Sequence, residues 1–550
     1  MPGSKPRSPR QVYQAVQRRR VHWSNDRRIR HLASEIDRHA ATQQRRLSAP
    51  VVFFNSSTRL TGVSLNAAFS MLTSWALRLQ GVPVIHFVCQ AGMSRCILGA
   101  REGTEQPPPC SACMAQSDVI YHHSQVAGFT ASETATESDL PGLVDADLEQ
   151  LTGYEFQGIP LGRLVLPGIR WVMRRHHLLD DKPTRFLFRE FLRSAYSVAR
   201  EFASLLDHAQ PSAVVIFNGQ FFPEATARWV AQQRGLRVIT YEVGLQPNSA
   251  FFTNGEATAY PLSISEAFDL SPEQNARLDA YLSRRFQGQF SMAGIQFWPE
   301  MRPLEPDFLD KAGRFRQLVP VFTNVIFDTS QPHSNVIFPH MFAWLDQTLE
   351  VIRCHPETLF VLRAHPDENR PGKASQESVR QWVEQNQVLA LPNVVFYDSA
   401  DYISSYELIQ RAKFSLVYNS TIGLEAAIMG TPVLCGGRAR FTQLPIVFFP
   451  QTQEAFHRQF EKFLIDDRII VPPEFVRNAR RFLYYQLFKS SLPFTDFIEP
   501  DEIWRGYVRL RSFPWQQLTP QASPTMQILV EGIKNNTPFI IPEEHENLYD

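Results

Sequence analysis

Short apolar runs that alternate with helix-length stretches constrain the fold of this chain most strongly. An apolar run at residues 51–54 is followed by a helical pattern at residues 64–79, which Ser64 would cap, and by a second apolar run at residues 82–88. The same alternation returns at residues 213–241. Strands joined by helix-length crossovers predict a parallel sheet wound by right-handed connections. We therefore expect a Rossmann-like unit in the first half of the chain.

A second alternating unit begins near residue 319. Apolar strands are predicted at residues 319–322, 358–362, 394–397 and 414–418, and helical patterns separate them. The predicted fold class is α/β, with two Rossmann-like, doubly wound domains that face each other across a cleft. Ligands of such sheets bind outside the carboxyl ends of the strands, so we expect the chemistry in the cleft.

The length agrees with several domains, because 550 residues exceed what one hydrophobic core holds. A Pro-rich stretch without strand signals separates the two units and indicates a connector, and scattered prolines near the C-terminus predict an extended surface tail. The expected parts are a basic helical extension (1–48), an N-terminal domain (49–262) with a four-cysteine insertion (89–113), the connector (263–312), a C-terminal domain (313–492) and the tail (493–550).

The composition is that of a folded, soluble protein, with 44% hydrophobic and 20% charged residues. The 55 basic residues balance the 55 acidic ones, which excludes whole-chain attraction to nucleic acid. No apolar run has the length of a membrane span, and the first residues lack the apolar core of a signal peptide. Six cysteines do not suggest a secreted disulfide scaffold. We expect a cytoplasmic protein.

The neutral total hides a basic N-terminus. Residues 1–48 contain 12 Lys and Arg against the three acids Asp26, Glu35 and Asp37, a net charge of +9. Their apolar residues have loose helical spacing. The segment is either a solvated helical extension or an arm that binds a partner or an anionic membrane surface. In the second case the protein would be peripheral at the inner membrane.

The most informative motif follows the predicted strand 414–418. Asn419, Ser420 and Thr421 form a small polar loop before a helix that contains Gly423 and Glu425. Hydroxyl and backbone N–H donors at a helix N-terminus form a site for anionic oxygens, and glycine would let a ligand approach. The glutamate would accept hydrogen bonds from ribose hydroxyls. Alternatively, Ser420 is only an N-cap and Glu425 only a partner of the helix dipole.

Two further strand ends in this half carry polar groups. The strand 358–362 continues into Arg363 and His365, and small polar residues follow the strand that ends at Phe322. Arginine offers a permanent charge and a fixed fork for phosphate, while histidine can move protons near neutral pH. Three polar strand ends in one domain predict a phosphate-binding edge.

The phrases FTNVIFDTS, FVLRAHPDE and SSYELIQRAKFSLVYNSTIGLEAAIMGTPVLCGG, in this order and spacing, resemble bacterial capsular polysaccharide biosynthesis glycosyltransferases of the two-Rossmann GT-B type. In the first half, AVVIFNGQFFPEATARWVAQQRGLRVITYEVG is similar to the corresponding strand, Asn-Gly turn, helix and strand of these proteins. The resemblance covers roughly residues 50–440. It implies transfer of a sugar from a nucleotide-sugar donor to a surface or capsular polysaccharide.

The resemblance also implies roles for the C-terminal motif residues. The diphosphate of the donor would lie against the polar loop and its helix, bordered by the two strand-end groups, of which His365 is also a candidate catalytic group, and the helix glutamate would hold the ribose. The implied donor-binding residues are Arg363, His365, Asn419, Ser420, Thr421, Gly423 and Glu425.

The N-terminal domain would bind the acceptor, a glycan or lipid-linked glycan, on the side of Gly62, Asn218 and Gly219. An inverting transferase needs a general base there, and Glu242 is the candidate. The alternative role of Glu242 is to shape its loop by hydrogen bonding. The chain departs from the family pattern at Gln220, where an arginine is more usual, which puts details of acceptor binding in doubt.

A second departure is the loop Cys435-Gly436-Gly437-Arg438 after the last strand, which concerns the donor side. No acidic pair indicates a catalytic metal. Enzymes of this type commonly hold the leaving phosphate with helix N-termini and basic groups, so we predict transfer that requires no metal and no other cofactor.

Four of the six cysteines lie close together in the sequence, at Cys89, Cys96, Cys110 and Cys113. The C-x2-C pair has the spacing to bind one tetrahedral ion, and the two earlier cysteines would complete a structural zinc site, although their spacing is wide. Unliganded buried thiols, a disulfide and an iron–sulfur cluster are the alternatives.

Two other functions share parts of these signals. A nucleotide-sugar 2-epimerase has the same two-domain fold and a similar phosphate loop. A non-catalytic scaffold for polysaccharide assembly would keep the nucleotide-binding fold and use the basic arm for docking. The sequence leaves open the donor nucleotide and sugar, the acceptor, and whether the anomeric configuration is inverted or retained.

Overall fold

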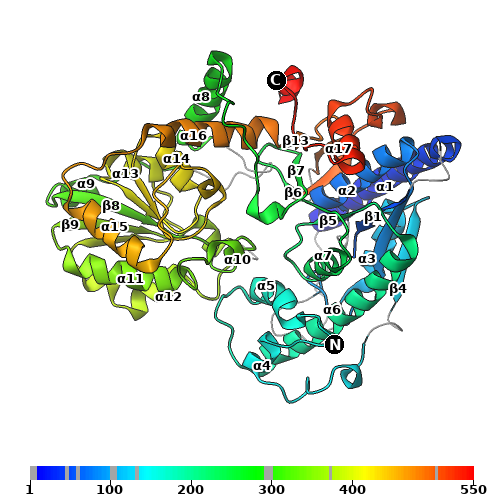
Figure 1. Cartoon of the computed structure of the whole chain (residues 1–550), viewed down its shortest axis with the longest axis horizontal. Helices are drawn as coiled ribbons and strands as arrows, with labels where there is room; N and C mark the ends of the chain where they lie inside the picture. The colour runs from blue at the N-terminus through cyan, green and yellow to red at the C-terminus, as the bar shows by residue number, and fades with distance from the viewer. Residues whose placement is uncertain are drawn as a thin grey trace. The chain divides into compact units, whose positions relative to one another are not determined.

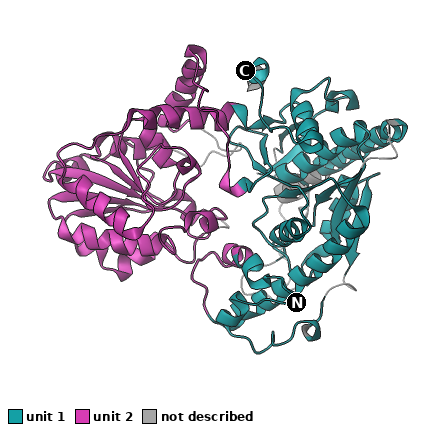
Figure 2. Cartoon of the chain, viewed as in Figure 1, with its two compact units in different colours: residues 1–166, 180–257, 489–550 teal, residues 167–179, 258–488 magenta. Residues whose placement is uncertain are grey.

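The structure is a computed structural model that describes residues 9–43, 49–56, 62–99, 108–130, 135–289, 301–370, 374–501 and 506–549. The chain divides into two compact units (Figure 2). Unit 1 comprises Met1–Leu166, Asp180–Ala257 and Lys489–Asp550, and unit 2 comprises Pro167–Leu179 and Thr258–Phe488. Each unit is built on its own parallel sheet (Figure 1).

The sheet of unit 1 has seven strands in the order β13-β7-β6-β5-β1-β3-β4. Five of them, β1 to β6 without β2, are parallel, and β7 and β13 add an antiparallel edge. Counted along the chain, the parallel strands lie in the order 3-2-1-4-5, which is that of a doubly wound Rossmann domain. The strands are β1 (Val51–Phe54), β3 (Val84–Gln90), β4 (Gln125–Thr130), β5 (Ala213–Phe217), β6 (Val238–Val243), β7 (Ser249–Thr253) and β13 (Leu492–Pro493).

The sheet of unit 2 has five strands in the order β10-β9-β8-β11-β12, and all of them are parallel. This is again 3-2-1-4-5, so the predicted fold class of two doubly wound α/β domains is confirmed. The strands are β8 (Gln317–Phe322), β9 (Thr358–Arg363), β10 (Val394–Tyr397), β11 (Ser415–Val417) and β12 (Val433–Cys435).

Helices connect the strands of both sheets. In unit 1 they are α1 (Pro9–Gln43), α2 (Leu65–Leu79), α3 (Cys110–Ile120), α4 (Leu148–Thr152), α6 (Lys182–Ala209), α7 (Glu224–Gln233) and α17 (Pro524–Asn535), and α5 (Leu161–Met173) belongs partly to each unit. In unit 2 they are α8 (Pro272–Phe286), α9 (Pro306–Ala312), α10 (Gln331–Ser334), α11 (Met341–Cys354), α12 (Val379–Gln385), α13 (Ser405–Arg411), α14 (Ile422–Ile428), α15 (Gln453–Ile465) and α16 (Pro473–Tyr484). Short helical turns lie at η2 (Glu137–Asp139), η3 (Ala257–Ala259), η4 (Pro366–Asn369), η5 (Val388–Ala390), η6 (Arg440–Gln443), η7 (Tyr485–Lys489), η8 (Trp515–Leu518) and η9 (Glu543–Tyr549).

Local sequence accounts for the placement of these elements. The β-branched and aromatic run of β1 is buried at every position, as parallel strands covered on both faces require. Ser64 caps α2, because its side chain accepts a hydrogen bond from the N–H of Ala67. Ser271 and Gln274 form a capping box at the start of α8.

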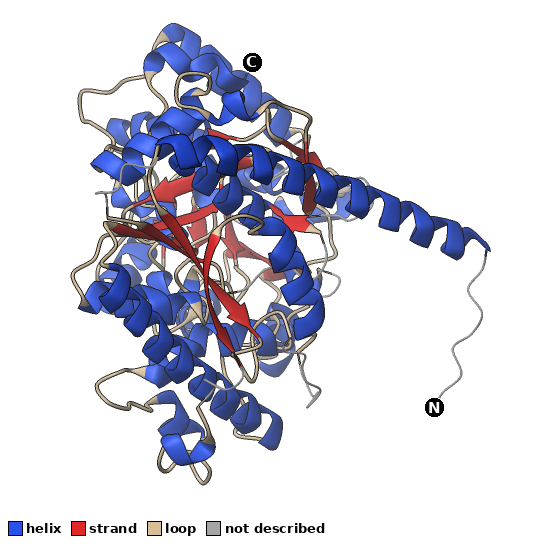
Figure 3. Ribbon diagram, turned by 90° about the vertical axis from the view of Figure 1, so that its right-hand side faces the viewer, coloured by secondary structure: helices blue, strands red, loops and turns tan. Residues whose placement is uncertain are grey.

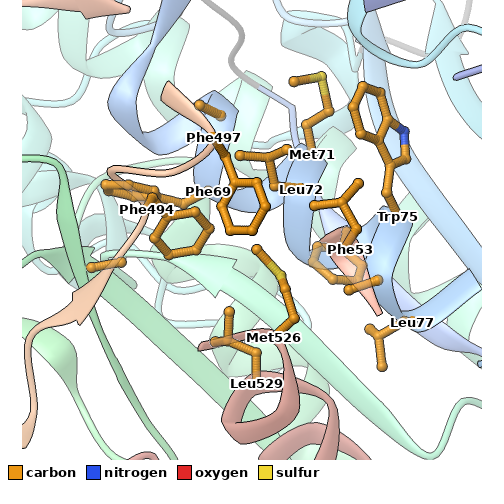
Figure 4. Packing of buried hydrophobic residues seen from close by; sticks show 14 of the residues in the cluster. Phe53, Phe69, Met71, Leu72, Trp75, Leu77, Phe494, Phe497, Met526 and Leu529 are labelled. Carbon is orange, nitrogen blue, oxygen red and sulfur yellow. The ribbon is translucent and has the colours of Figure 1, made fainter. Parts of the chain in front are cut away.

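The C-terminal residues are not the extended surface tail that the scattered prolines suggested. In unit 1, β13 joins the main sheet, and β14 (Ile498–Pro500) and β15 (Tyr507–Leu510) form a three-stranded sheet with β2 (Val63–Ser64). Figure 4 shows Phe494 beside Phe69, and Met526 and Leu529 of α17 in the same buried cluster. The prolines lie at element ends, as Pro524 does in the first turn of α17, where proline costs no hydrogen bond.

The other predicted boundaries also differ from those of the units. Helix α1 is not a separate extension, because Ile29, Leu32 and Ile36 belong to the core of unit 1. The connector 263–312 contributes α8 and α9 to unit 2. The cysteines do not form an insertion, because Cys89 lies in β3 and Cys110 begins α3, so they span an ordinary strand-to-helix connection.

A segment from the first half of the chain, Pro167–Leu179, belongs to unit 2. Its His177 forms a hydrogen bond of 2.5 Å with the carboxylate of Glu377 and one of 3.1 Å between its Nε2 and that of His340. Among the described residues, no helix is long and apolar enough to span a bilayer.

We predict that Leu529→Ala destabilises unit 1 by about 2 to 5 kcal/mol, because truncating a fully buried leucine leaves a cavity. Ile465→Ala is the control, since Ile465 is 65% exposed and should change stability by less than about 0.5 kcal/mol. Urea unfolding followed by tryptophan fluorescence measures both variants. Equal effects would mean that α17 does not contribute to the core.

Candidate functional site

The candidate site lies at the point in unit 2 where the winding of the sheet reverses. Strands β8 and β11 are neighbours, and the chain proceeds from β8 to β9 and β10 on one side and from β11 to β12 on the other. Connections of one hand then place the crossover helices on opposite faces, which separates the loops after β8 and β11. A crevice at the carboxyl ends of these strands is the expected ligand site of such a sheet.

One pocket opens at this position, and residues from several elements line it. They follow β8, β9 and β11, precede or lie in α13 and α14, and come from the end of α8 and the segment after it. The lining residues are Arg285, Gly288, Met301, Phe322, Thr323, Arg363, Ala364, His365, Pro366, Asp367, Ile403, Ser405, Tyr406, Ser420, Thr421, Ile422 and Glu425. The structure thus brings together Arg363, His365, Ser420, Thr421 and Glu425 from the predicted set.

Asn419 and Gly423 are not among the lining residues. The side chain of Asn419 donates a hydrogen bond of 2.5 Å to Oγ of Ser334, so it fixes α10 against the polar loop. A Cβ on Gly423 would lie 3.0 Å from side-chain carbons of both Val417 and Phe441. Glycine is therefore required there for close packing of α14 on β11, whereas we expected it to admit a ligand.

The polar loop enters α14 without a side-chain cap. Thr421 is the N-cap residue, and its hydroxyl accepts no capping hydrogen bond. The N–H of Gly423 donates to the carbonyl of Ser420, and the N–H of Leu424 donates to that of Thr421. The alternative interpretation of Ser420 as the N-cap is therefore wrong, and both hydroxyl side chains border the pocket.

Glu425 is the most enclosed acidic group of the pocket, with only 5% of its side chain exposed. Its Oε1 accepts hydrogen bonds from Nε and Nη2 of Arg285, at 2.9 and 2.6 Å, and its Oε2 accepts one of 2.5 Å from the hydroxyl of Tyr406. Both oxygens thus have partners from the protein itself. Arg285 and Tyr406 are site residues that the sequence did not indicate.

The electrostatics of this trio follow from its burial. Burial acts against the charge of Arg285, but the carboxylate of Glu425 outweighs it, and the pKa of Arg285 lies above its ordinary value. Burial and the same carboxylate raise the pKa of Tyr406, so the phenol stays protonated and donates to Glu425. The trio therefore holds one positive charge, one negative charge and one neutral donor at the pocket wall.

Arg363 and His365 border the pocket from the end of β9. Burial lowers the pKa of Arg363 to about 10, so the guanidinium remains charged at neutral pH, and its Nη1 donates to the carbonyl oxygen of Asp398 at 2.5 Å. The Nδ1 of His365 accepts a hydrogen bond of 3.2 Å from the N–H of Asp367. The neutral imidazole must then carry its proton on Nε2, and burial lowers its pKa.

In unit 1, two of the predicted acceptor-side residues lie with Glu242 at the carboxyl ends of β5 and β6. Asn218 and Gly219 both have left-handed backbone, with φ of 61° and 78°. The side-chain N–H of Asn218 donates to Oε2 of Glu242 at 2.7 Å, and the N–H of Val243 donates to Oε1 at 3.0 Å. Glu242 thus has the loop-shaping contacts that we gave as its alternative role.

The remaining acceptor-side predictions lie in other surroundings. Gly62 has a φ of 79°, and a Cβ there would lie 3.0 Å from side-chain atoms of His22 and Tyr507, so this glycine serves the contact of α1 with β15. The side chain of Gln220, the departure from the family pattern, donates to Glu256 at 2.7 Å.

The four clustered cysteines line a second, largely apolar pocket in unit 1, together with Ser56 after β1 and Met93. None of them forms a disulfide. Burial raises the pKa of Cys89 to about 11 and that of Cys96 to about 12. Within the described residues, no three His, Cys, Asp or Glu side chains are placed to hold one metal ion together. The structural zinc therefore stays a prediction.

Comparison with protein families supports the resemblance over part of unit 2. Residues 317–447, from β8 to beyond β12, match the family model of the capsule polysaccharide biosynthesis protein. The similarity to this family is confirmed for that segment. None of the curated proteins matches the chain.

Three solved structures illustrate the similarity in space. They are KpsC β-Kdo 2,4 transferase of Thermosulfurimonas dismutans (12% identity, 51% of this chain and 80% of that chain, TM-score 0.32), KpsC β-Kdo 2,7 transferase of the same organism (15%, 60% and 89%, 0.31) and UDP-GlcNAc 2-epimerase of Neisseria meningitidis bound to UDP-GlcNAc (11%, 80% and 99%, 0.26). These identities and TM-scores are too low to support an inference about activity.

We predict about one equivalent of zinc in the purified protein, held by the four cysteines. Replacing Cys110 and Cys113 with serine should remove it, while Cys354→Ser, at an exposed cysteine, should leave the metal content unchanged. Elemental analysis with a thiol titration measures both. Less than about a tenth of an equivalent, without a brown chromophore, would identify the cysteines as ordinary buried thiols.

Proposed function

We propose that the chain is a glycosyltransferase that moves a sugar from a nucleotide-sugar donor to a surface or capsular polysaccharide acceptor. The observation that carries this proposal is the convergence of Arg363, His365, Ser420 and Thr421 in one pocket at the winding reversal of a Rossmann sheet. The pocket lies largely within the segment that matches the capsule polysaccharide family. Fixed cations and hydroxyl donors in one crevice suit a diphosphate.

The donor would bind with its diphosphate against the hydroxyl loop of Ser420 and Thr421. Arg285 and Arg363 supply positive charge that is already fixed by hydrogen bonds, so little reorganisation is needed when phosphate charge develops. Glu425 keeps the role of ribose acceptor in this proposal, because a carboxylate has about four lone-pair positions and three hydrogen bonds are accounted for.

In the reaction, the acceptor hydroxyl attacks the anomeric carbon, the bond from that carbon to the donor phosphate oxygen breaks, and the nucleotide leaves with the electron pair. The acceptor proton must pass to a base. Glu242 in unit 1 stays the candidate for this base, and His365 stays a candidate for proton transfer on the donor side. We further propose that the leaving phosphate is neutralised by the basic groups, so that no metal is required.

We predict that UDP, CMP or GDP raises the melting temperature of the protein, because a ligand that binds only the folded state stabilises it. Arg363→Ala should abolish this shift, and Glu425→Ala should weaken nucleotide affinity roughly tenfold or more, since it leaves Arg285 buried without its carboxylate. Arg314→Ala is the control at an exposed arginine of unit 2. Stabilisation by none of the nucleotides would favour the non-catalytic scaffold.

We also predict that nucleotide release from the productive nucleotide sugar increases when a polysaccharide acceptor is added, and that EDTA does not reduce the rate. Screening nucleotide sugars for hydrolysis without acceptor identifies the donor first. Clean epimerisation of the sugar with donor alone would show a 2-epimerase instead. Activity lost in EDTA and restored by Mg²⁺ would contradict the metal-independent mechanism.

A further inference from the structure

Helix α1 presents one face to the core of unit 1 and the opposite face to solvent. Ile29, Leu32, Ala33 and Ile36 are buried, and α1 packs against α2, α3, β15 and η8. Figure 3 shows α1 as one continuous helix. Because its inner face is fixed by this packing, the direction of its outer face is fixed as well.

The outer face carries a line of basic side chains. Arg20, Arg27, His31 and Arg38 are exposed and follow one another at intervals of seven, four and seven residues, close to whole helical turns. Arg30 is exposed beside them. The line from the first to the last arginine is about 27 Å long at 1.5 Å per residue. We call Arg20, Trp23, Arg27, Arg30, His31 and Arg38 the outer stripe.

The acidic residues of α1 do not cancel this charge. Asp37 forms an ion pair of 2.7 Å with Arg78 of α2, and Glu35 has only 28% of its side chain exposed. Asp26 is half-buried on the inner side of the helix, where burial raises its pKa. The outer stripe therefore keeps a positive potential.

Trp23 distinguishes this stripe from an ordinary solvated face. Its side chain is 65% exposed, and the guanidinium of Arg27 lies 5.6 Å from the centre of its ring. An exposed tryptophan among arginines is the composition of helices that lie in the membrane interface, where the indole inserts at headgroup level and the arginines contact anionic lipid. Nucleic acid would use the same charges but has no need of the exposed indole beside them in a duplex complex.

We propose that the outer stripe of α1 docks the protein on an anionic lipid bilayer, with Trp23 in the interface and the arginines on lipid headgroups. The expectation from the sequence assigned this role to residues 1–48 as a whole. The packing of α1 assigns it to one face of the helix. This docking does not depend on the proposed transferase activity, and binding alone tests it.

The experiment is vesicle co-sedimentation of the full chain with phosphatidylcholine vesicles that contain or lack phosphatidylglycerol. We expect binding only to the anionic vesicles. Reversing Arg20, Arg27 and Arg38 to Glu should lower the partition coefficient at least about hundredfold, since each basic residue near the surface contributes about a factor of five. The matched control reverses Arg314, Arg458 and Arg468, three exposed arginines of unit 2, and should bind much more tightly than the stripe variant.

Quenching by brominated lipid acyl chains tests the role of Trp23. The tryptophan fluorescence that bromine quenches should disappear in Trp23→Phe, and Trp23→Ala should bind more weakly than Ile470→Ala, the control at a residue that is 83% exposed. Equal binding to neutral and anionic vesicles, or equal losses in the two arginine variants, would overturn the proposal. Binding to a soluble polyanion as tight as to vesicles, without quenching, would instead identify a nucleic-acid surface.

Discussion

The reversal of winding between β8 and β11 is the constraint on which the candidate site depends. Both strands are buried, so their side chains can only contribute to the core. Polar groups are tolerated where these strands end, because there the loops diverge and leave the edge open. Thr323 and Ser420 occupy these two ends, and β9 beside them ends in Arg363. The topology thus gathers polar groups that lie almost one hundred residues apart.

The buried trio of Arg285, Tyr406 and Glu425 gives this edge its charge. Removing an arginine and a carboxylate from water costs several kcal/mol for each ion, and pairing offsets that cost only with good geometry. Such a pair contributes little to stability compared with an apolar replacement of the same volume. Its value is rigidity: Arg285 is held at the pocket wall before any ligand arrives. Together with Arg363 it leaves the pocket with more fixed positive than negative charge, which suits an anionic ligand.

Local patterns were sufficient to predict the strands, the caps and the polar strand ends. The alternation of apolar runs and helices gave both sheets, because the period and the length of each run are local properties. Arg363 and Glu425 were found because they follow strands. Arg285 was missed, since it reaches Glu425 from a helix 140 residues earlier and its own neighbours in sequence resemble an ordinary basic helix end. No local signal encodes a contact of that range.

The errors have physical causes of the same kind. Gly423 was identified as necessary for the wrong reason, because the sequence could not show that Val417 and Phe441 press against it. The prolines of the C-terminal segment suggested a tail, although proline is compatible with element ends, and the apolar residues between them supply part of the core.

The closure of unit 1 by both ends of the chain explains why α1 has a defined outer face. The N–H of Leu510 in β15 donates to the side chain of Asn25 at 2.9 Å, and Arg28 donates to the carbonyl of the same residue. The N-terminal helix is therefore anchored by a strand from the far end of the sequence. Without that strand, the apolar and basic faces of α1 would have no fixed direction. With it, the charge of the N-terminal segment becomes a surface of unit 1, which a flexible arm of the same composition would not provide.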